Sequence, residues 1–119
     1  MTFQKNIGDL GENIAHDYLI KNKYKVIERN FRKPWGEIDI ICSASDKTLV
    51  FVEVKTMHEG DLKPEDQLTK SKLLKIQKTA QLYTGHFPEK ISEKRGWQID
   101  LIAITFSFGK YFIKHYKNI

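Results

Sequence analysis

Four charged side chains interrupt a stretch that otherwise has the composition of two buried strands. In WGEIDIICSASDKTLVFVEVKTM, residues 35–57, Glu37 and Asp39 lie in the first apolar run, and Glu53 and Lys55 lie in the second. An unpaired charge inside a protein costs roughly several kcal/mol. The four charges therefore need a common structural or chemical reason.

The two runs are expected to pair as an antiparallel hairpin through the polar turn SASDKT, residues 43–48. Side chains alternate faces along a strand, so Glu37 shares a face with Asp39, and Glu53 shares a face with Lys55. The alternate positions are aliphatic and are expected to face the core: Ile38, Ile40, Val50, Val52 and Val54. This pattern places the charges together on the opposite face of the sheet.

Folding the hairpin about the middle of its turn brings Asp39 opposite Glu53, within one residue of register. Two neighbouring carboxylates repel each other unless a proton or a cation lies between them. Their oxygens suit Mg²⁺ or Mn²⁺, ions that keep several waters and accept phosphate oxygens. With the Lys55 ammonium nearby, this set of groups is suited to hydrolysis of a phosphodiester bond. Glu12, at the edge of the apolar stripe of a preceding helix, is a third carboxylate within reach.

A structural interpretation of the same residues is open. Lys55 can neutralise Glu53 in a cross-strand ion pair on a solvated sheet face. Ile41, Leu49 and Phe51 share that face, which indicates instead that it is covered.

Two further acidic sites are interpreted as structural or solvated. The pattern Asp/Glu-x-Lys occurs again at residues 61–63, in a loop with flanking Gly and Pro and no apolar strand, and it is expected to be exposed. Glu37 can bind metal as an auxiliary ligand or orient the turn after Gly36, and the second role is favoured.

The elements that must position these side chains follow from the hydrophobic periodicity. Thr69 suits the N-cap of a helix, and residues 56–66 are expected to form an exposed loop. The expected order is a helix, three strands, a helix and two strands, over residues 7–20, 24–32, 37–42, 49–55, 69–86, 97–106 and 110–117. This order predicts an α/β fold in which helices cover a mixed sheet.

Length and charge limit the protein class. A chain of 119 residues is expected to form one domain, residues 1–119. Twenty Lys plus Arg against fifteen Asp plus Glu give a net charge of +5, which favours polyanionic partners such as nucleic acid. No apolar run approaches the roughly 18 residues of a membrane span, and the start MTFQKNIGDL lacks the apolar core of a signal peptide. We therefore expect a cytoplasmic protein, with its single cysteine, Cys42, buried and inert.

Other residues with chemical potential receive structural interpretations. The four histidines show no ligand spacing. Asp100 is expected to be structural, with Arg95 as a candidate partner. The lysines of the second helix spread around it, which indicates general solubility rather than a groove: Lys70, Lys72, Lys75 and Lys78. Three aromatic residues near strand ends can stack on bases but more often belong to a core or interface: Phe31, Trp35 and Trp97.

The segment GEIDII…FVEVKT resembles the Asp-x(n)-Glu-x-Lys core of the PD-(D/E)xK nuclease superfamily, which includes type II restriction enzymes and archaeal Holliday-junction resolvases. The chain is more similar still to the YraN-like family of uncharacterised small bacterial proteins, over nearly its whole length. The positions that match are Gly11-Glu12, Arg29-Asn30, Gly36 to Asp39, Phe51 to Lys55, Lys72 and Asp100. Two positions differ, with Ile38 in place of the superfamily's proline and Met57 where the YraN-like family usually has arginine.

The resemblance implies a restriction-endonuclease-like three-layer fold with a mixed sheet of about five strands flanked by helices. It implies Asp39 and Glu53 as ligands of Mg²⁺ or Mn²⁺, Lys55 as the catalytic lysine, Glu12 as an auxiliary carboxylate and Lys72 on the substrate side. The implied activity is hydrolysis of DNA, including branched DNA, by a homodimer. A non-catalytic nucleic-acid-binding or partner-docking module with the same fold is the alternative, and an RNA-processing nuclease is a third interpretation.

Overall fold

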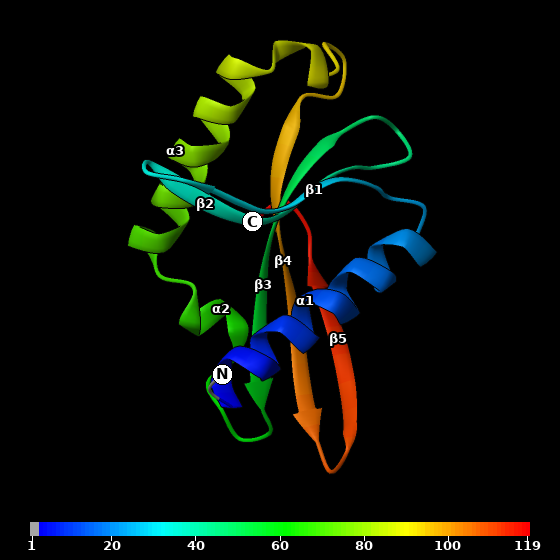
Figure 1. Cartoon of the computed structure of the whole chain (residues 1–119), viewed down its shortest axis with the longest axis vertical. Coiled ribbons are helices and arrows are strands. Elements are labelled where there is room, and N and C mark those ends of the chain that lie inside the picture. The colour runs from blue at the N-terminus through cyan, green and yellow to red at the C-terminus, as the bar shows by residue number, and fades with distance from the viewer. Residues whose placement is uncertain (1–2) are drawn as a thin grey trace.

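The structure is a computed structural model that describes residues 3–119, apart from the side chains of residues 3–6 and 65. Five strands form one mixed sheet in the order β1-β2-β3-β4-β5 (Figure 1). Strands β3 and β4 are parallel, and the other neighbouring strands are antiparallel. The strands span Lys25–Lys33 (β1), Gly36–Ser43 (β2), Leu49–His58 (β3), Trp97–Ser107 (β4) and Lys110–Tyr116 (β5).

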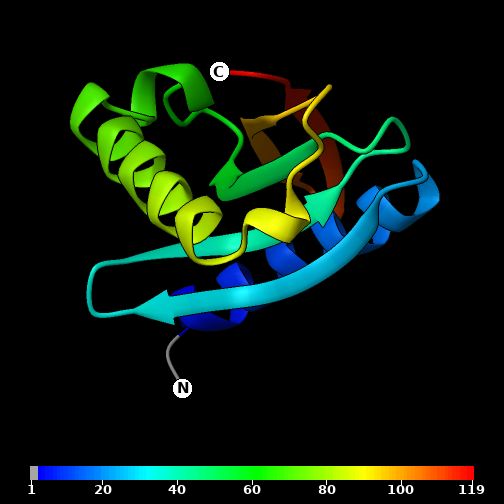
Figure 2. The ribbon, with the colours of Figure 1, turned by 90° about the horizontal axis from the view of Figure 1, so that it is seen from above.

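Helices cover both faces of this sheet. Helix α1 (Phe3–Lys21) packs against β1, β3 and β4, and α3 (Lys70–His86) packs against β2. Figure 2 shows the two helices on opposite sides of the strands. The short α2 (Pro64–Gln67), α3 and the 3₁₀ helix η1 (Pro88–Lys90) lie in the connection from β3 to β4, because parallel strands need a long crossover. The predicted three-layer fold, with a mixed five-stranded sheet flanked by helices, is confirmed.

Each face of the sheet has its own apolar core, so the central strands are buried on both sides, as their nearly continuous apolar sequences indicate. Cys42 is buried, as predicted. The core toward α1 contains Ala15, Leu19, Ile40, Cys42, Val50, Val52, Ile102 and Ile104. The core toward α3 contains Phe31, Ile38, Ile41, Leu49, Phe51, Ile76, Ala80, Tyr83 and Ile99.

Most predicted elements are present, with shifted ends. Strand β3 continues past Lys55 to His58, because β4 supplies parallel partners as far as the pair His58–Phe106. The loop expected after Lys55 is therefore shorter, and it contains α2. Thr69 is the N-cap of α3, as predicted, and its hydroxyl accepts a hydrogen bond from Lys72 N at 3.2 Å. In the part of the chain that the structure describes, no helix is long and apolar enough to cross a membrane.

The prediction that Ile38 shares a face with Ile40 is wrong, because Ile38 packs toward α3 and Ile40 packs toward α1. The β1–β2 hairpin is strongly twisted relative to the other strands (Figure 1), and the β2–β3 ladder ends at the pair Ile40–Val52. Asn30, between the β1 partners of Ile38 and Ile40, has a left-handed φ of 53°. Strict alternation therefore fails at Asp39. The other members of the predicted set do pack toward α1: Ile40, Val50, Val52 and Val54.

Candidate active site

Two carboxyl groups meet where β2 separates from β3. Beyond the Ile40–Val52 pair, Asp39 and Glu53 face each other, and their carboxyl groups are hydrogen-bonded. Asp39 Oδ2 also accepts a hydrogen bond from Val54 N at 2.8 Å. The β2–β3 ladder has ended at this point. The Val54 amide therefore donates to the Asp39 carboxylate instead of to a backbone carbonyl of β2. The predicted neighbourhood of Asp39 and Glu53 is confirmed.

Burial raises the pKa of both carboxyl groups. The pKa of Glu53 rises to about 7, mainly through burial and then through the charge of Asp39, against the opposing effects of Lys55 and Lys72. Burial also raises the pKa of Asp39, while the hydrogen bond from Val54 lowers it. Two neighbouring carboxyl groups of this kind titrate as a pair, and each disfavours the charged form of the other.

Two lysines meet beside the carboxyl pair, Lys55 from β3 and Lys72 from the first turn of α3. A hydrogen bond with Lys72 is the largest cause that lowers the pKa of Lys55, and burial adds to it. The ion pairs of the described residues do not include one between Lys55 and Glu53, so the cross-strand ion pair considered as a structural alternative does not form. A lysine with a lowered pKa beside a carboxyl group is suited to proton exchange.

Glu12 approaches the carboxyl pair from α1. The helix lies close to β3 because residue 11 is glycine, and a Cβ at Gly11 would lie 2.0 Å from Thr56 Cγ2. Glu12 Oε1 is buried and, among the described residues, has no hydrogen-bond partner. Burial raises the pKa of Glu12, as does the charge of Asp39, while Arg29 opposes them. An unpaired buried oxygen is costly, so this atom is open to a water or ligand.

Two arginines of β1 border the site. Arg29 Nη2 donates to Asn13 Oδ1 at 2.8 Å, while its buried Nε has no partner in the described part of the chain. Arg32 pairs with Glu37 at 3.3 Å. Glu37 is therefore engaged with Arg32 on the surface. Neither arginine received a role at the site in the sequence analysis. The match of Arg29-Asn30 to the family pattern was the signal that could have found Arg29.

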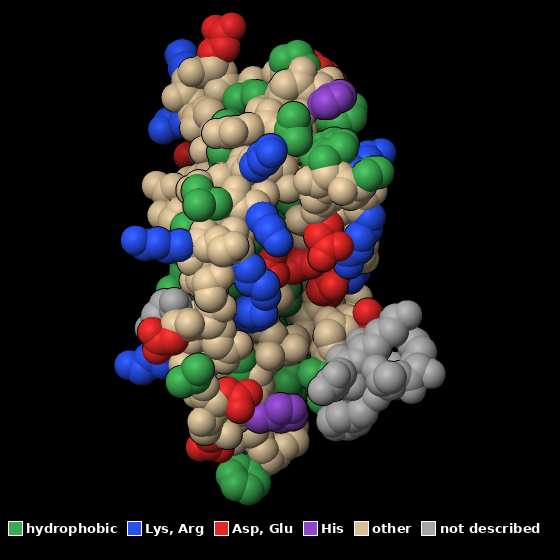
Figure 3. Space-filling model, turned by 90° about the vertical axis from the view of Figure 1, so that its left-hand side faces the viewer, with side chains coloured by type: hydrophobic (Ala, Val, Ile, Leu, Met, Phe, Trp, Pro, Cys, Tyr) green, Lys and Arg blue, Asp and Glu red, His purple; other side chains and the backbone are tan. Residues whose placement is uncertain are grey.

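Glu53 faces a cleft of about 570 Å³ between α3 and the β1–β2 turn. Figure 3 shows acidic side chains in the middle of this face, with Lys and Arg side chains on both sides. The prediction that the α3 lysines spread around the helix without lining a groove is wrong for Lys72, Lys75 and Lys78, because their i, i+3, i+6 spacing turns slowly around the helix. The cleft is lined by Pro34, Trp35, Gly36, Glu37, Glu53, Lys72, Lys75, Ile76, Lys78 and Thr79.

Asp100 belongs to a separate buried network. Its side chain is 0% exposed and accepts hydrogen bonds from Gln98 Nε2 at 2.8 Å and Asn118 N at 2.9 Å, with His115 Nε2 at 2.7 Å. Burial raises the pKa of Asp100, but the hydrogen bonds from His115, Asn118 and Gln98 outweigh it and lower the pKa below its ordinary value. Asp100 is thus a satisfied structural carboxylate, with His115 and not Arg95 as its ionisable partner.

The carboxyl pair fits a divalent cation of the magnesium type. Among the described residues, no three His, Cys, Asp or Glu side chains are close enough together to hold one metal ion. Mg²⁺, however, typically binds one or two carboxylates and keeps several waters. Asp39 and Glu53 supply two neighbouring carboxylates, and the unpaired Glu12 Oε1 suits a water beside them.

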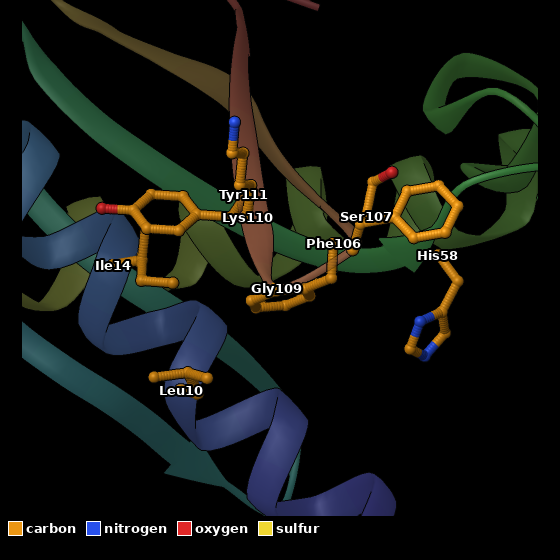
Figure 4. A pocket seen from close by; sticks show the side chains of 9 residues that line it. Leu10, Ile14, His58, Phe106, Ser107, Gly109, Lys110 and Tyr111 are labelled. Carbon is orange, nitrogen blue, oxygen red and sulfur yellow. The ribbon is translucent and has the colours of Figure 1, made fainter.

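A second hollow of about 530 Å³ lies between α1 and the turn that joins β4 to β5. Figure 4 shows Leu10 and Ile14 on α1 facing this turn. Asp39, Glu53 and Lys55 do not line it, so it is distinct from the candidate site. Its lining is Leu10, Ile14, His58, Phe106, Ser107, Phe108, Gly109, Lys110 and Tyr111.

The second Asp-x-Lys copy, residues 61–63, is exposed, as predicted. Asp61 accepts a hydrogen bond from His58 N at 2.9 Å. This second copy lies outside the apolar strands and outside the cleft. Substitutions in it therefore serve as controls for substitutions of the first copy, Glu53-x-Lys55.

Residues 11–104 match the model of the Uncharacterised protein family UPF0102. The chain belongs to this family. UPF0102 relatives include a protein of Clostridium botulinum (strain Loch Maree / Type A3), 42% identical over 119 residues, which cover 96% of this chain and 93% of that protein. A UPF0102 protein of Syntrophomonas wolfei is 36% identical over 115 residues, or 96% of each chain. One of Fervidobacterium nodosum is 36% identical over 118 residues, covering 99% of this chain and 84% of that protein. The predicted membership of the YraN-like family is confirmed.

Among solved structures, Pyrococcus furiosus SfsA in complex with Ca²⁺ matches 96% of this chain and 63% of its own, with 15% sequence identity and a TM-score of 0.38. A likeness this slight says nothing about what the UPF0102 chain binds.

Proposed function

We propose that this UPF0102 protein is a metal-dependent endonuclease that hydrolyses phosphodiester bonds of DNA. The observation that carries the proposal is the Asp39–Glu53 pair, two half-buried carboxyl groups held face to face, with the pKa of Glu53 raised to about 7. Buried charges in structural positions are normally paired and hydrogen-bonded. Two carboxyl groups that each disfavour the charged form of the other are instead suited to a cation from solution.

In the proposed site, Asp39 and Glu53 would hold Mg²⁺ or Mn²⁺. Such an ion supplies positive charge toward a phosphate oxygen and acidifies a water. Asp39 is oriented by the Val54 amide, so the β3 backbone fixes one ligand. Glu53 must lose its proton before it can act as the second ligand, because metals bind the carboxylate form.

Lys55 and Glu12 complete the proposed chemistry. The pKa of Lys55 is lowered by its contact with Lys72, so Lys55 is placed to exchange a proton with the attacking water or with the leaving oxygen. Glu12 offers its unpaired Oε1 as an acceptor that orients this water.

DNA is the proposed substrate because the net charge of +5 favours a polyanion and because the sequence resembles DNA nucleases and junction resolvases. Selectivity for branched DNA and a homodimer with two sites are part of the same proposal. Light scattering of the purified protein tests the dimer, and a monomer that cuts junctions on two strands at once would contradict it.

The test is cleavage of duplex and four-way-junction DNA with Mg²⁺, Mn²⁺ or a chelator. We expect cleavage with either ion, none with chelator, and loss of at least about 100-fold in Asp39→Ala and Lys55→Ala. Matched controls come from the second copy of the motif, where Asp61→Ala and Lys63→Ala should cleave like the wild type. Activity that survives both Asp39→Ala and Lys55→Ala refutes the proposal.

The lysine-lined cleft supports a second candidate, a nucleic-acid-binding module that does not cut. Such a module binds DNA without metal, with an affinity that falls steeply as salt rises. It predicts that Asp39→Ala leaves binding unchanged and that no DNA is cleaved by the wild type with either ion.

A further inference from the structure

The two walls of the cleft differ in chemistry. The α3 wall presents Lys72, Lys75 and Lys78, whereas the β1–β2 turn presents Trp35 and Glu37. A polyanionic strand in this cleft would turn its phosphates toward the α3 wall, because that wall carries three lysines, whereas Glu37 on the other wall is paired with Arg32. The bases of that strand would then face Trp35.

Trp35 packs against two other aromatic rings and lines the cleft. Its indole ring stacks on His86 of α3, with centroids 5.9 Å apart and an interplanar angle of 12°, and it meets Phe31 at 5.6 Å and 61°. His86 Nδ1 lies 2.7 Å from the Leu82 carbonyl oxygen. Trp35 is nevertheless 38% exposed. A supported aromatic ring with free surface is the usual platform on which an unpaired base stacks.

The cleft is preformed because the β1–β2 turn and α3 touch. A Cβ at Gly36 would lie 2.0 Å from Thr79 Oγ1, so only glycine permits this approach. Lys72 and Lys78 are separated by about 9 Å along the helix axis, at a rise of about 1.5 Å per residue. The lysine wall can therefore follow one strand over more than a single phosphate.

The exposed Trp35 ring and the small volume of the cleft favour a single strand over an intact duplex. Stacked neighbours cover the base faces in a duplex, so those faces are not available to Trp35, whereas unpaired bases can be splayed onto an aromatic ring. The volume of about 570 Å³ is in the range of small-ligand pockets. The cleft thus has room for a short piece of one strand.

We propose that the cleft between α3 and the β1–β2 turn binds an unpaired nucleic-acid strand, with a base on Trp35 and phosphates on Lys75 and Lys78. Glu53 lines the same cleft. A strand bound there therefore reaches the Asp39–Glu53 pair through an unpaired segment. The statement that this strand is the one cut rests on the proposed function, whereas the statement that it binds does not.

The test measures binding without catalysis. The chain has two tryptophans, so Trp97→Phe leaves Trp35 as the single indole fluorophore. In chelator, oligo-dT should quench Trp35 fluorescence to saturation, and a blunt duplex of equal length should bind at least about 10-fold more weakly. Anisotropy of a labelled oligonucleotide with the wild type gives the same comparison without the Trp97 substitution.

Two sets of variants separate stacking from charge. Trp35→Ala should weaken single-strand binding about 5- to 100-fold, and Trp35→Phe should retain most of it, because the ring is kept. Lys75→Gln and Lys78→Gln should each lower the slope of log affinity against log salt by about 0.7. Lys70→Gln is the matched control, since Lys70 lies on the same helix and does not line the cleft.

The outcomes distinguish this inference from the proposed function. Equal affinity for single strand and duplex, or full binding by Trp35→Ala, overturns the inference even if metal-dependent cleavage is found. Tight, Trp35-dependent binding of single strands with no cleavage of any DNA supports the inference and overturns the nuclease assignment.

Discussion

Asp39 and Asp100 are two aspartates withdrawn from solvent beside β3, and their surroundings shift their pKa values in opposite directions. Asp100 receives hydrogen bonds from Gln98, Asn118 and His115, which lower its pKa. Asp39 faces another carboxyl group, and burial raises its pKa. The first aspartate is surrounded by hydrogen-bond donors of the chain, whereas the second has one amide donor and a neighbouring carboxyl group. This difference separates a carboxylate that stabilises the fold from one that is suited to a ligand.

The Asp100 network also joins distant parts of the chain. His115 of β5 contacts Asp100 of β4, and its Nδ1 lies 2.9 Å from the Tyr18 hydroxyl of α1. Removing Asp100 should therefore loosen α1, β4 and β5 together, whereas removing Asp39 relieves repulsion within the carboxyl pair.

The largest expected effect comes from the matched substitutions Asp39→Asn and Asp100→Asn. Asp39→Asn should reduce cleavage at least about 100-fold and leave the free energy of unfolding unchanged or higher. Asp100→Asn should lower the free energy of unfolding by about 3 kcal/mol, because the donors around it lose their charged acceptor. Urea unfolding and cleavage rates per folded molecule measure both quantities. Equal destabilisation by the two variants would contradict the comparison.

Metal binding should act on the carboxyl pair alone. Mg²⁺ or Mn²⁺ at 100 times its Kd should stabilise the wild type by about 2.7 kcal/mol. At one fixed ion concentration, this gain should be larger at pH 8 than at pH 6, because Glu53, with a pKa of about 7, must release its proton and the Kd therefore falls as pH rises. Thermal unfolding with and without the ion measures the gain. Asp39→Asn should lose the response and Asp100→Asn should keep it; an equal response in both variants would place the ion elsewhere.

The two carboxylates should also give opposite dependences of stability on pH. Glu53 has a raised folded-state pKa, so the folded chain binds more protons than the unfolded chain between about pH 4.5 and 7, and stability should fall as pH rises through this window. The drop should be on the order of 1 to 3 kcal/mol. Asp100 has a lowered pKa, so its contribution should be lost as pH falls through and below 3.8.

Chemical unfolding of the metal-free protein across pH 3 to 8 tests this prediction. Glu53→Gln should reduce the decline toward neutral pH, to which Asp39 and Glu12 also contribute through their raised pKa values, and should leave the acid limb in place. An unchanged decline in Glu53→Gln would assign it to another group.

The smallest expected effect concerns the placement of Glu12. Gly11→Ala should destabilise the fold by about 1 to 2 kcal/mol and reduce cleavage, because its Cβ would lie 2.0 Å from Thr56 Cγ2 and push α1 away from β3. Adding Thr56→Ser removes that methyl group and should restore part of the loss. Gly8→Ala is the control, since a Cβ there meets nothing within 4 Å, and it should stabilise α1 by about 0.5 to 1 kcal/mol. A similar loss in Gly8→Ala would mean that the close contact is not the cause.

The sequence predicted those features that depend on local pattern. The Asp39–Glu53 contact follows from a short hairpin whose turn fixes the register, and Thr69 marks the start of α3 by its side chain alone. The position of Ile38 could not be predicted, because β1 and β2 twist where Asn30 takes a left-handed conformation. Alternation assumes a regular strand, and the strand is irregular at the carboxyl pair.

Long-range contacts account for the other differences. Whether an exposed lysine of α3 lines a cleft depends on the distant β1–β2 turn, so the grouping of Lys72, Lys75 and Lys78 requires the assembled fold. His115 reaches Asp100 only through the β4–β5 register, together with Asn118 beyond the last strand. Spacing among the histidines gave no signal for it, because the partner is a carboxylate and not a metal.

The hydrogen bond from Val54 to Asp39 provides a spectroscopic reporter of the site. The Val54 amide is protected by a side chain and not by a neighbouring strand, so its hydrogen-exchange rate depends on how firmly that carboxylate is held. A divalent ion on the carboxyl pair should slow exchange at Val54 while leaving the amide of Asn118, which Asp100 protects, unaffected. Exchange measured at these two amides would then follow occupancy of the site without a substrate, and equal slowing of both would indicate a general stiffening of the sheet.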